Sequence, residues 1–317
     1  MCRSPPESRR LGSYHSSLVG RSAEQSLLRD GFARAASGRA ALALIGGEAG
    51  IGKTSLVRDF LDHARAGGAA ALAGGCYDLQ VTPPFGPWAD LTRVGGTSDM
   101  ADIFLNVAQD VQGDQPVRSR GELFHRYADA ISTIAQDRPI VVALEDLHWS
   151  DPDSLDLLRF LVRTADTIPL FLIATYRDDE VEPGTPLYDR LPMLVRETDA
   201  TRVDLRRLTL EDTRELVIRR YHLVDADATR LVTYLDELAQ GNPLFIHELL
   251  RALEADDSLQ HPSIPAREWR FSQTPQGHVP ALIRQVIDRR LQRLGNATRQ
   301  ALDVAAVIGG DIPLDLW

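Results

Sequence analysis

The residues with the clearest chemical meaning run from Gly47 to Thr54. Their order, Gly-Glu-Ala-Gly-Ile-Gly-Lys-Thr, fits the pattern Gly-x-x-x-x-Gly-Lys-Ser/Thr. Glycines in such a loop let the backbone turn so that successive N–H groups point inward at phosphate oxygens. Lys53 would reach the β and γ phosphates of ATP, and the Thr54 hydroxyl would ligate Mg²⁺. The candidate nucleotide-binding residues of this P-loop are Gly47, Glu48, Ala49, Gly50, Ile51, Gly52, Lys53, Thr54 and Ser55.

A second group of candidate residues follows an apolar stretch over residues 140–144. Glu145 and Asp146 come directly after it, and a buried parallel strand would deliver them at the sheet edge beside the P-loop. We expect Glu145 to serve the metal and Asp146 to orient or deprotonate the attacking water. The competing interpretation is an ordinary strand followed by a solvated turn, and the P-loop upstream makes it less favourable.

The third candidate is Arg177, which follows the apolar stretch over residues 169–175. A cation at the end of a strand can sense the γ-phosphate. The alternative is a surface arginine that pairs with Asp178 or Asp179. The predicted catalytic set is therefore Lys53, Glu145, Asp146 and Arg177.

These residues need a sheet to bring them together. Apolar stretches predict strands over residues 40–45, 69–73, 140–144 and 169–175, and helical spacing predicts helices over 21–36, 53–66, 121–136 and 151–164. Alternation of this kind favours an α/β fold, with a mostly parallel sheet and helices on both faces. Asp151 is the expected N-cap of the fourth helix.

The sequence after about residue 206 predicts helices only. We expect them over residues 209–221, 226–240, 243–254, 279–294 and 296–307, with a polar linker over 256–278. Thr209 and Asp212 have the spacing of a capping box at the start of the first of these helices.

Composition excludes several classes of protein. The chain of 317 residues has a formal net charge of -10, which disfavours direct DNA binding because nucleic-acid binders usually carry a basic face. The two cysteines, Cys2 and Cys76, do not suggest a disulfide framework or a zinc site, so a reducing compartment, the cytoplasm, is expected. We expect no membrane contact, because no uncharged run approaches the roughly 18 residues that span a bilayer.

The order of several motifs resembles one known family of ATPases. The chain is similar to the STAND class of AAA-related ATPases, and in particular to the ATPase module of large LuxR-type transcriptional regulators, the group that includes the maltose regulon activator. Similar modules are joined to some nucleotide cyclases. The motifs, in chain order, are LVGR (residues 18–21), GEAGIGKTS, GGCYDL, TPPFGPW, LEDLHWSDPDSLDLL, ATYRDDE, QGNPLFIHELL and VPALIRQVIDRRLQRL.

The resemblance implies further roles. Val19, Gly20 and Arg21 would border the adenine, and Pro243, in Gly-Asn-Pro, would pack on it and report nucleotide state. ADP would hold the protein closed, and exchange for ATP, prompted by an inducer of unknown identity, would allow self-association. The expected organisation is a flexible tail (residues 1–17), a nucleotide-binding domain (18–205), a helical lid (206–255), a linker (256–278) and the start of a winged-helix domain (279–317).

The chain departs from this family in two respects. Glu145 stands where the family often has Asp, which would slow hydrolysis while leaving nucleotide binding intact. Neither a helix-turn-helix nor a cyclase signature is evident, so the output domain is missing or resides elsewhere, and DNA would be contacted only through a segment outside the chain. The sequence stops on the apolar segment IGGDIPLDLW, which leads us to expect a piece of a longer product. The alternative functions are a nucleotide-dependent scaffold or adaptor with little hydrolysis and, less favoured, a small-molecule kinase.

Three aromatic positions and one histidine have open interpretations. Phe85 and Trp88 either cover the nucleotide or pack in the core, and core packing is favoured. His148 and Trp149 either pack against the next helix or contact phosphate.

Overall fold

The computed structural model describes residues 18–78, 83–91, 120–165, 167–260, 269–272, 281–292 and 294–308. The expected tail over residues 1–17, most of the expected linker and residues 309–317 lie outside this part of the chain. The chain divides into two compact units, Met1–Arg206 and Arg207–Trp317.

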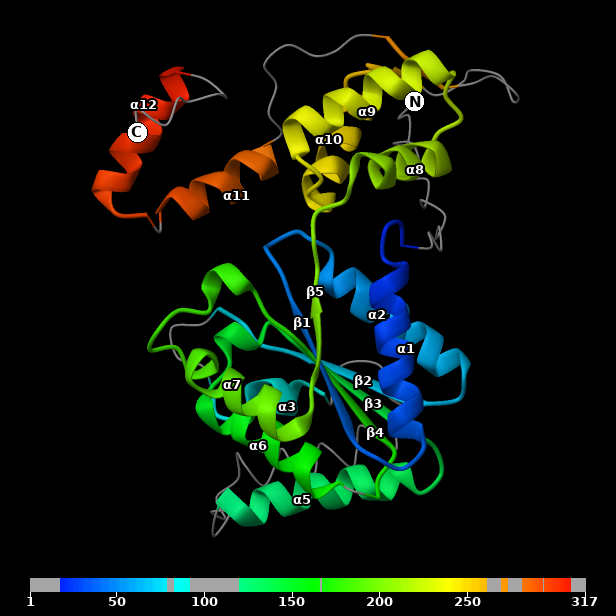
Figure 1. Cartoon of the computed structure of the whole chain (residues 1–317), viewed down its shortest axis with the longest axis vertical. Helices are drawn as coiled ribbons and strands as arrows, with labels where there is room; N and C mark the ends of the chain where they lie inside the picture. Colours follow the sequence, from blue (N-terminus) through cyan, green and yellow to red (C-terminus); the bar gives the residue numbers. More distant parts are fainter. Residues whose placement is uncertain are drawn as a thin grey trace, which may run out of the picture. The chain divides into compact units, whose positions relative to one another are not determined.

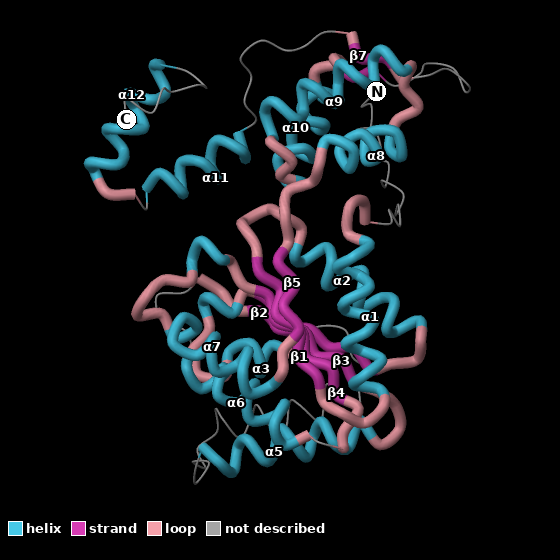
Figure 2. The backbone as a smooth tube through the Cα atoms, viewed as in Figure 1, coloured by secondary structure: helices cyan, strands magenta, loops and turns pink. Residues whose placement is uncertain are grey.

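The first unit is built on a five-stranded parallel sheet with the order β2-β3-β4-β1-β5. Figure 2 shows these strands as one twisted sheet with helices on either side. The expected α/β fold of a P-loop ATPase is confirmed. The strands are β1 (Ala41–Gly46), β2 (Ala70–Gly75), β3 (Ile140–Glu145), β4 (Leu170–Thr175) and β5 (Thr201–Asp204).

Helices cover both faces of the sheet, as Figure 1 shows. One face packs on α1 (Ser22–Ala36) and α2 (Lys53–Ala66). The opposite face packs on α3 (Gly86–Asp90), α5 (Arg120–Ala135), α6 (Pro152–Thr164) and α7 (Pro186–Thr198). All six residues of β4 are buried, because a strand covered on both faces needs a continuous apolar run rather than alternation. Two short 3₁₀ turns, Leu147–Trp149 and Asp178–Glu180, follow β3 and β4.

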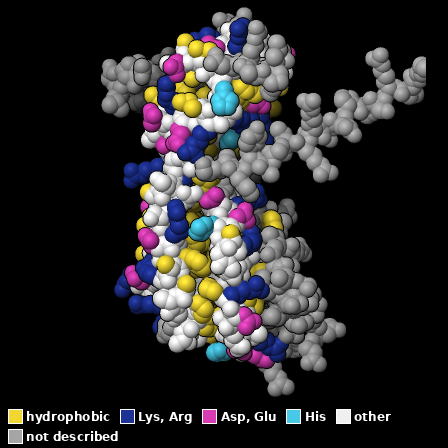
Figure 3. All heavy atoms as spheres, turned by 90° about the vertical axis from the view of Figure 1, so that its right-hand side faces the viewer, with side chains coloured by type: hydrophobic (Ala, Val, Ile, Leu, Met, Phe, Trp, Pro, Cys, Tyr) yellow, Lys and Arg dark blue, Asp and Glu magenta, His cyan; other side chains and the backbone are white. Residues whose placement is uncertain are grey.

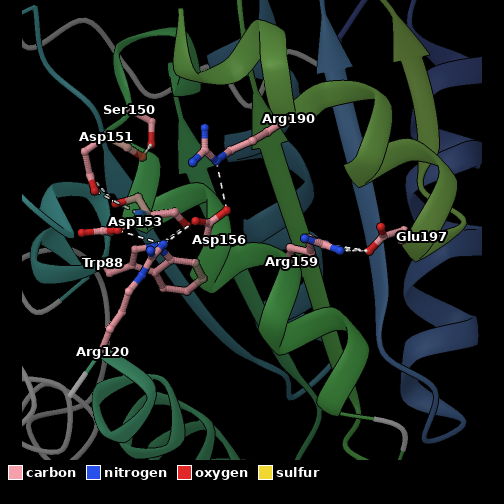
Figure 4. A network of polar contacts seen from close by, with 10 residues as sticks. Trp88, Arg120, Ser150, Asp151, Asp153, Asp156, Arg159, Arg190 and Glu197 are labelled. Atoms are coloured by element: carbon pink, nitrogen blue, oxygen red, sulfur yellow. Dashed lines mark hydrogen bonds and ion pairs between the residues drawn. The ribbon is translucent and has the colours of Figure 1, made fainter.

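A polar network joins the helices on the second face (Figure 4). Asp151 caps α6 by accepting from the Ser154 N–H at 3.0 Å, as expected from the sequence. The indole of Trp88 donates to the Ser154 carbonyl at 3.1 Å. Asp156 on α6 accepts from Arg190 at 3.0 Å and from Arg120. Burial alone would raise the pKa of Asp156, but the two arginines hold it below its usual range. The network therefore links α5, α6 and α7.

The sequence missed β5 and α7. Strand β5 has four residues, of which only Val203 is fully buried, so it lacks the apolar run that marks the inner strands. Helix α7 contains Pro192, a residue that normally breaks a helix. At the start of α7, the Thr185 side chain caps the helix by accepting from the Tyr188 N–H.

The second unit is mainly helical. Helices α8 (Leu210–Arg220), α9 (Asp225–Ala239) and α10 (Pro243–Ala255) enclose its core, and Thr209 and Asp212 form the expected capping box. The prediction that no strand follows residue 206 is wrong, because β6 (Leu259–Gln260) and β7 (Arg270–Phe271) pair antiparallel. They are only two residues each, too short for a sequence pattern to reveal. Helices α11 (Ala281–Gln292) and α12 (Asn296–Ile308) follow.

Candidate nucleotide-binding site

The P-loop leaves the carboxyl end of β1, an inner strand between β4 and β5. Two glycines make its path possible. Gly47 has φ +147°, and a Cβ there would lie 3.1 Å from both the Ile51 side chain and the Leu205 carbonyl. Gly52 has φ +101° and is the N-cap of α2, which begins at Lys53. The loop thus ends on a helix N-terminus, where free N–H groups and the helix dipole favour an anion.

Lys53 lies across this loop. Its side chain is buried, and its ammonium donates to the carbonyls of Gly47 at 2.6 Å and Glu48 at 2.9 Å. Burial lowers the pKa of Lys53, and the nearby Asp146 carboxylate opposes that change. The Lys53 ammonium is therefore held at the P-loop, where it interacts electrostatically with Asp146, which follows a different strand.

Thr54 and Glu145 meet directly. The Thr54 hydroxyl, in the first turn of α2, donates to the Glu145 carboxylate at the end of β3 across 2.5 Å. Strand β4 separates β1 from β3 in the sheet, so only the fold brings these two side chains together. Hydroxyl and carboxylate oxygens suit Mg²⁺, which takes one or two protein ligands and completes its shell with phosphate and water. Among the described residues, no cluster of three or more His, Cys, Asp or Glu could hold a metal.

Asp146 occupies a left-handed turn with φ +60°. Its N–H donates to the Thr175 hydroxyl at 3.0 Å, which joins the end of β3 to the end of β4. Burial raises the pKa of the Asp146 carboxyl, while Arg177 and Lys53 oppose the change. Thr175 is a contact that was not predicted from the sequence, although a hydroxyl that ends an otherwise apolar strand was an available signal.

Arg177 follows β4 and faces the same turn. Its guanidinium donates to Glu180 at 2.6 Å, lies 3.9 Å from the Asp146 carboxylate and stacks 4.9 Å from the Trp149 ring centroid. The sequence suggested Asp178 or Asp179 as the surface partner, whereas the structure pairs Arg177 with Glu180. No pattern in the sequence distinguished Glu180 from the two acids before it.

The segment before α1 contacts the P-loop. The guanidinium of Arg21 is buried, donates to the Ile51 carbonyl at 3.0 Å and pairs with Glu24 at 3.3 Å. Val19 is half-buried and Gly20 exposed. Arg21 thus ties this segment to the loop, which gives it a role that the sequence did not suggest.

Four candidates from the sequence remain. Ser55 is exposed on α2. Pro243 belongs to the second unit, where it begins α10 behind the N-cap Asn242. Trp88 and Phe85 are buried in the core beneath α5 and α6, so the core-packing interpretation of both is confirmed.

A separate hollow of about 490 Å³ lies between α5 and α6. Its charged lining is already paired: Arg120 with Asp153 and Asp156, and Arg159 and Arg163 with Glu197. It offers no uncompensated charge to a phosphate. The P-loop edge of the sheet is the better candidate site.

Comparisons with known proteins agree with the fold. Residues 17–173, a little under half of the chain, match the model of the AAA ATPase domain. An uncharacterized protein of Rhizobium meliloti is 27% identical over an alignment that covers 88% of this chain and 28% of that protein, so the chain spans well under a third of this relative.

Two solved structures share the fold at low sequence identity. A Walker-type ATPase of Pyrococcus abyssi has a TM-score of 0.55 at 16% identity, covering 93% of this chain and 85% of that one. Cdc6p from Pyrobaculum aerophilum has a TM-score of 0.54 at 13% identity, covering 78% and 65% of the two chains. Identities this low speak for the fold alone. Residues 17–173 are therefore similar to an AAA ATPase domain, and the fold is that of a P-loop ATPase.

Proposed function

We propose that this AAA ATPase domain binds Mg-ATP at the carboxyl edge of its sheet and hydrolyses it slowly, as the switch of a STAND-type signalling ATPase. The observation that carries the proposal is the contact between the Thr54 hydroxyl and the Glu145 carboxylate beside the N-terminus of α2. A metal-ligating pair at a phosphate-binding loop is what nucleotide hydrolysis requires.

The residues of the site have separate roles in this proposal. Thr54 and Glu145 would hold Mg²⁺, which when bound neutralises charge on the phosphates. The loop N–H groups and Lys53 bind the β and γ phosphates. Asp146 orients the attacking water and accepts its proton, and Arg177 stabilises charge on the γ-phosphate. Arg21 keeps the loop in place through the Ile51 carbonyl.

The switch is the finer part of the proposal and rests on the motif order in the sequence. ADP holds the protein closed, and ATP, bound after an inducer acts, permits self-association in the cytoplasm. Val19, Gly20 and Arg21 border the adenine, and Pro243 packs on it and reports nucleotide state. Transcription is regulated through an output segment elsewhere. On the face drawn in Figure 3, Lys and Arg side chains are interspersed with Asp and Glu.

A second candidate is an adaptor that binds nucleotide with little turnover. The observation in its favour is that Glu180 and Asp146 already surround Arg177, so the arginine is partly neutralised. No helix in the described part of the chain is long and apolar enough to cross a membrane.

The test combines nucleotide affinity and turnover on one sample. ATP and ADP binding are measured by calorimetry with Mg²⁺, followed by phosphate release. Lys53→Ala removes the phosphate-facing cation, and Arg58→Ala, an exposed cation on the same helix, is the matched control. Slow turnover that depends on Lys53 and not on Arg58 supports the ATPase. Tight binding without turnover supports the adaptor, and absence of nucleotide binding would refute both.

A further inference from the structure

Four ionisable side chains form a closed ring at the ends of β3 and β4. The His148 Nδ1 lies 3.9 Å from the Asp146 carboxylate and its Nε2 lies 3.5 Å from Glu180. Glu180 uses its other oxygen to accept from Arg177 at 2.6 Å, and the Arg177 Nε lies 3.9 Å from the same Asp146 oxygen that faces His148. Acids and bases alternate around the ring.

The two sides of this ring differ in exposure. The side chains of His148 and Glu180 are 1% and 9% exposed, whereas those of Asp146 and Arg177 are 29% and 22% exposed. The more exposed, open side thus consists of Asp146, which is assigned to the attacking water, and Arg177, which is assigned to the γ-phosphate. The closed side consists of two groups that the proposed reaction does not use.

Packing against Trp149 further restricts the side chains of His148 and Arg177. The Trp149 ring lies 4.4 Å from His148 and 4.9 Å from the Arg177 guanidinium, measured to its centroid. An arginine stacked on an aromatic face and bound to a carboxylate has little freedom to change its orientation. The ring nitrogens of His148 face Asp146 and Glu180, which favours packing or bridging over phosphate contact as its role.

We propose that His148 and Glu180 are positioning residues, which fix Arg177 and Asp146 relative to each other so that both face the γ-phosphate. This inference rests on the proposed ATPase function. His148 bridges the two acids, and Glu180 bridges His148 and Arg177, so removing either member releases the groups on the open side.

Two substitutions at His148 separate bridging from packing. His148→Phe keeps an aromatic ring against Trp149 but cannot approach the acids as a donor, whereas His148→Gln keeps a donor. We expect His148→Phe to lower kcat about tenfold with KM for ATP changed less than about twofold, because the lost contact acts on the reacting phosphate rather than on substrate binding. His148→Gln should recover at least about half of the wild-type kcat.

Glu180→Gln provides an independent test, since it removes charge without removing volume. We expect the same fall in kcat as for His148→Phe. The matched controls are His63→Phe on α2 and Glu182→Gln after the second 3₁₀ turn, both exposed, and they should behave as wild type. If His148→Phe fails to fold, as judged by its thermal unfolding midpoint, Glu180→Gln carries the test.

A double-mutant comparison asks whether the histidine acts through Arg177. On an Arg177→Ala background, His148→Phe should change kcat less than about twofold, because residues in one network are not additive. If the wild type shows no turnover, the ratio of ATP to ADP affinity reports the same contact, and His148→Phe should shrink that ratio about tenfold.

The outcomes distinguish a failure of the proposed ATPase function from a failure of the positioning role of His148 and Glu180. A wild type that neither binds nor hydrolyses ATP overturns the proposed function and this inference with it. A wild type with Lys53-dependent turnover, together with wild-type rates for His148→Phe and Glu180→Gln, overturns the positioning role alone. Equal losses in the Phe and Gln variants would also overturn it, since a side chain that keeps a donor would then be no better than one that has none.

Discussion

At the scale of single residues, the contact between Thr54 and Glu145 defines where Mg²⁺ would bind. We expect Thr54→Ala and Glu145→Gln each to weaken ATP binding in Mg²⁺ about tenfold, to the level seen in EDTA, because each removes one oxygen ligand. Calorimetry with and without Mg²⁺ measures this. Ser26→Ala, which alters an exposed hydroxyl on α1, is the control. A Thr54→Ala protein that still responds fully to Mg²⁺ would place the metal elsewhere.

Asp146 links catalysis to stability. Its pKa is raised, chiefly by burial, so the folded state binds a proton more readily than the unfolded chain. Stability therefore falls as pH rises from the usual aspartate range through the raised pKa. Asp146→Asn should raise Tm at neutral pH, the gain should disappear below the usual carboxyl range, and turnover should fall about 100-fold.

Thermal unfolding across pH tests this expectation for Asp146, with the exposed Asp137→Asn as the control. A Tm difference between Asp146→Asn and wild type that does not vary with pH would contradict it. The opposite changes in stability and turnover are typical of a carboxylate kept charged at a buried position for function.

At the scale of elements, the P-loop depends on what precedes α1 as well as on β1 and α2. The buried Arg21 guanidinium donates to the Ile51 carbonyl, and a hydrogen bond from a charged group contributes about 1.5–3 kcal/mol. We expect Arg21→Ala to weaken nucleotide binding about tenfold and to lower Tm. Arg29→Ala, which alters an exposed arginine of α1 that donates to the Gln25 carbonyl on its own helix, should do neither. Equal affinities of the two variants would remove Arg21 from the site.

At the scale of the whole molecule, the chain enters its second unit through a close backbone contact. The Leu208 N–H donates to the Gly241 carbonyl at 2.9 Å. Gly241 has φ +74°, and a Cβ there would lie 2.2 Å from the Leu208 carbonyl oxygen. This places the Gly-Asn-Pro element directly against the first residues after the unit boundary.

Gly241→Ala should therefore destabilise the second unit by about 1–3 kcal/mol, since both the strained φ and the backbone clash oppose it. Calorimetric unfolding without nucleotide checks this: the transition of the second unit should move to lower temperature, and that of the first unit should remain. Gly295→Ala, where a Cβ would meet nothing within 4 Å, is the control. A single transition that shifts equally in both variants would contradict the expectation.

The P-loop turn, the helix caps and the inner strands could be predicted from the sequence, because each depends on residues that are neighbours in the chain. The turn from β1 into α2 needs glycine at Gly47 and Gly52, the caps at Asp151 and Thr209 need short polar side chains, and the inner strands need apolar runs, so each is readable locally. These features were sufficient to predict the α/β fold and which loops would meet at one sheet edge.

The tertiary structure alone decided which side chains meet there. Glu180 rather than its neighbours accepts from Arg177, and Arg21 reaches Ile51 across 30 positions of sequence. Edge strand β5 and the strand pair β6–β7 likewise depend on partners distant in the chain. The physical reason is that such contacts are selected by geometry and burial after the chain has packed, and a linear pattern of polar and apolar residues does not specify which of several equivalent partners is closest.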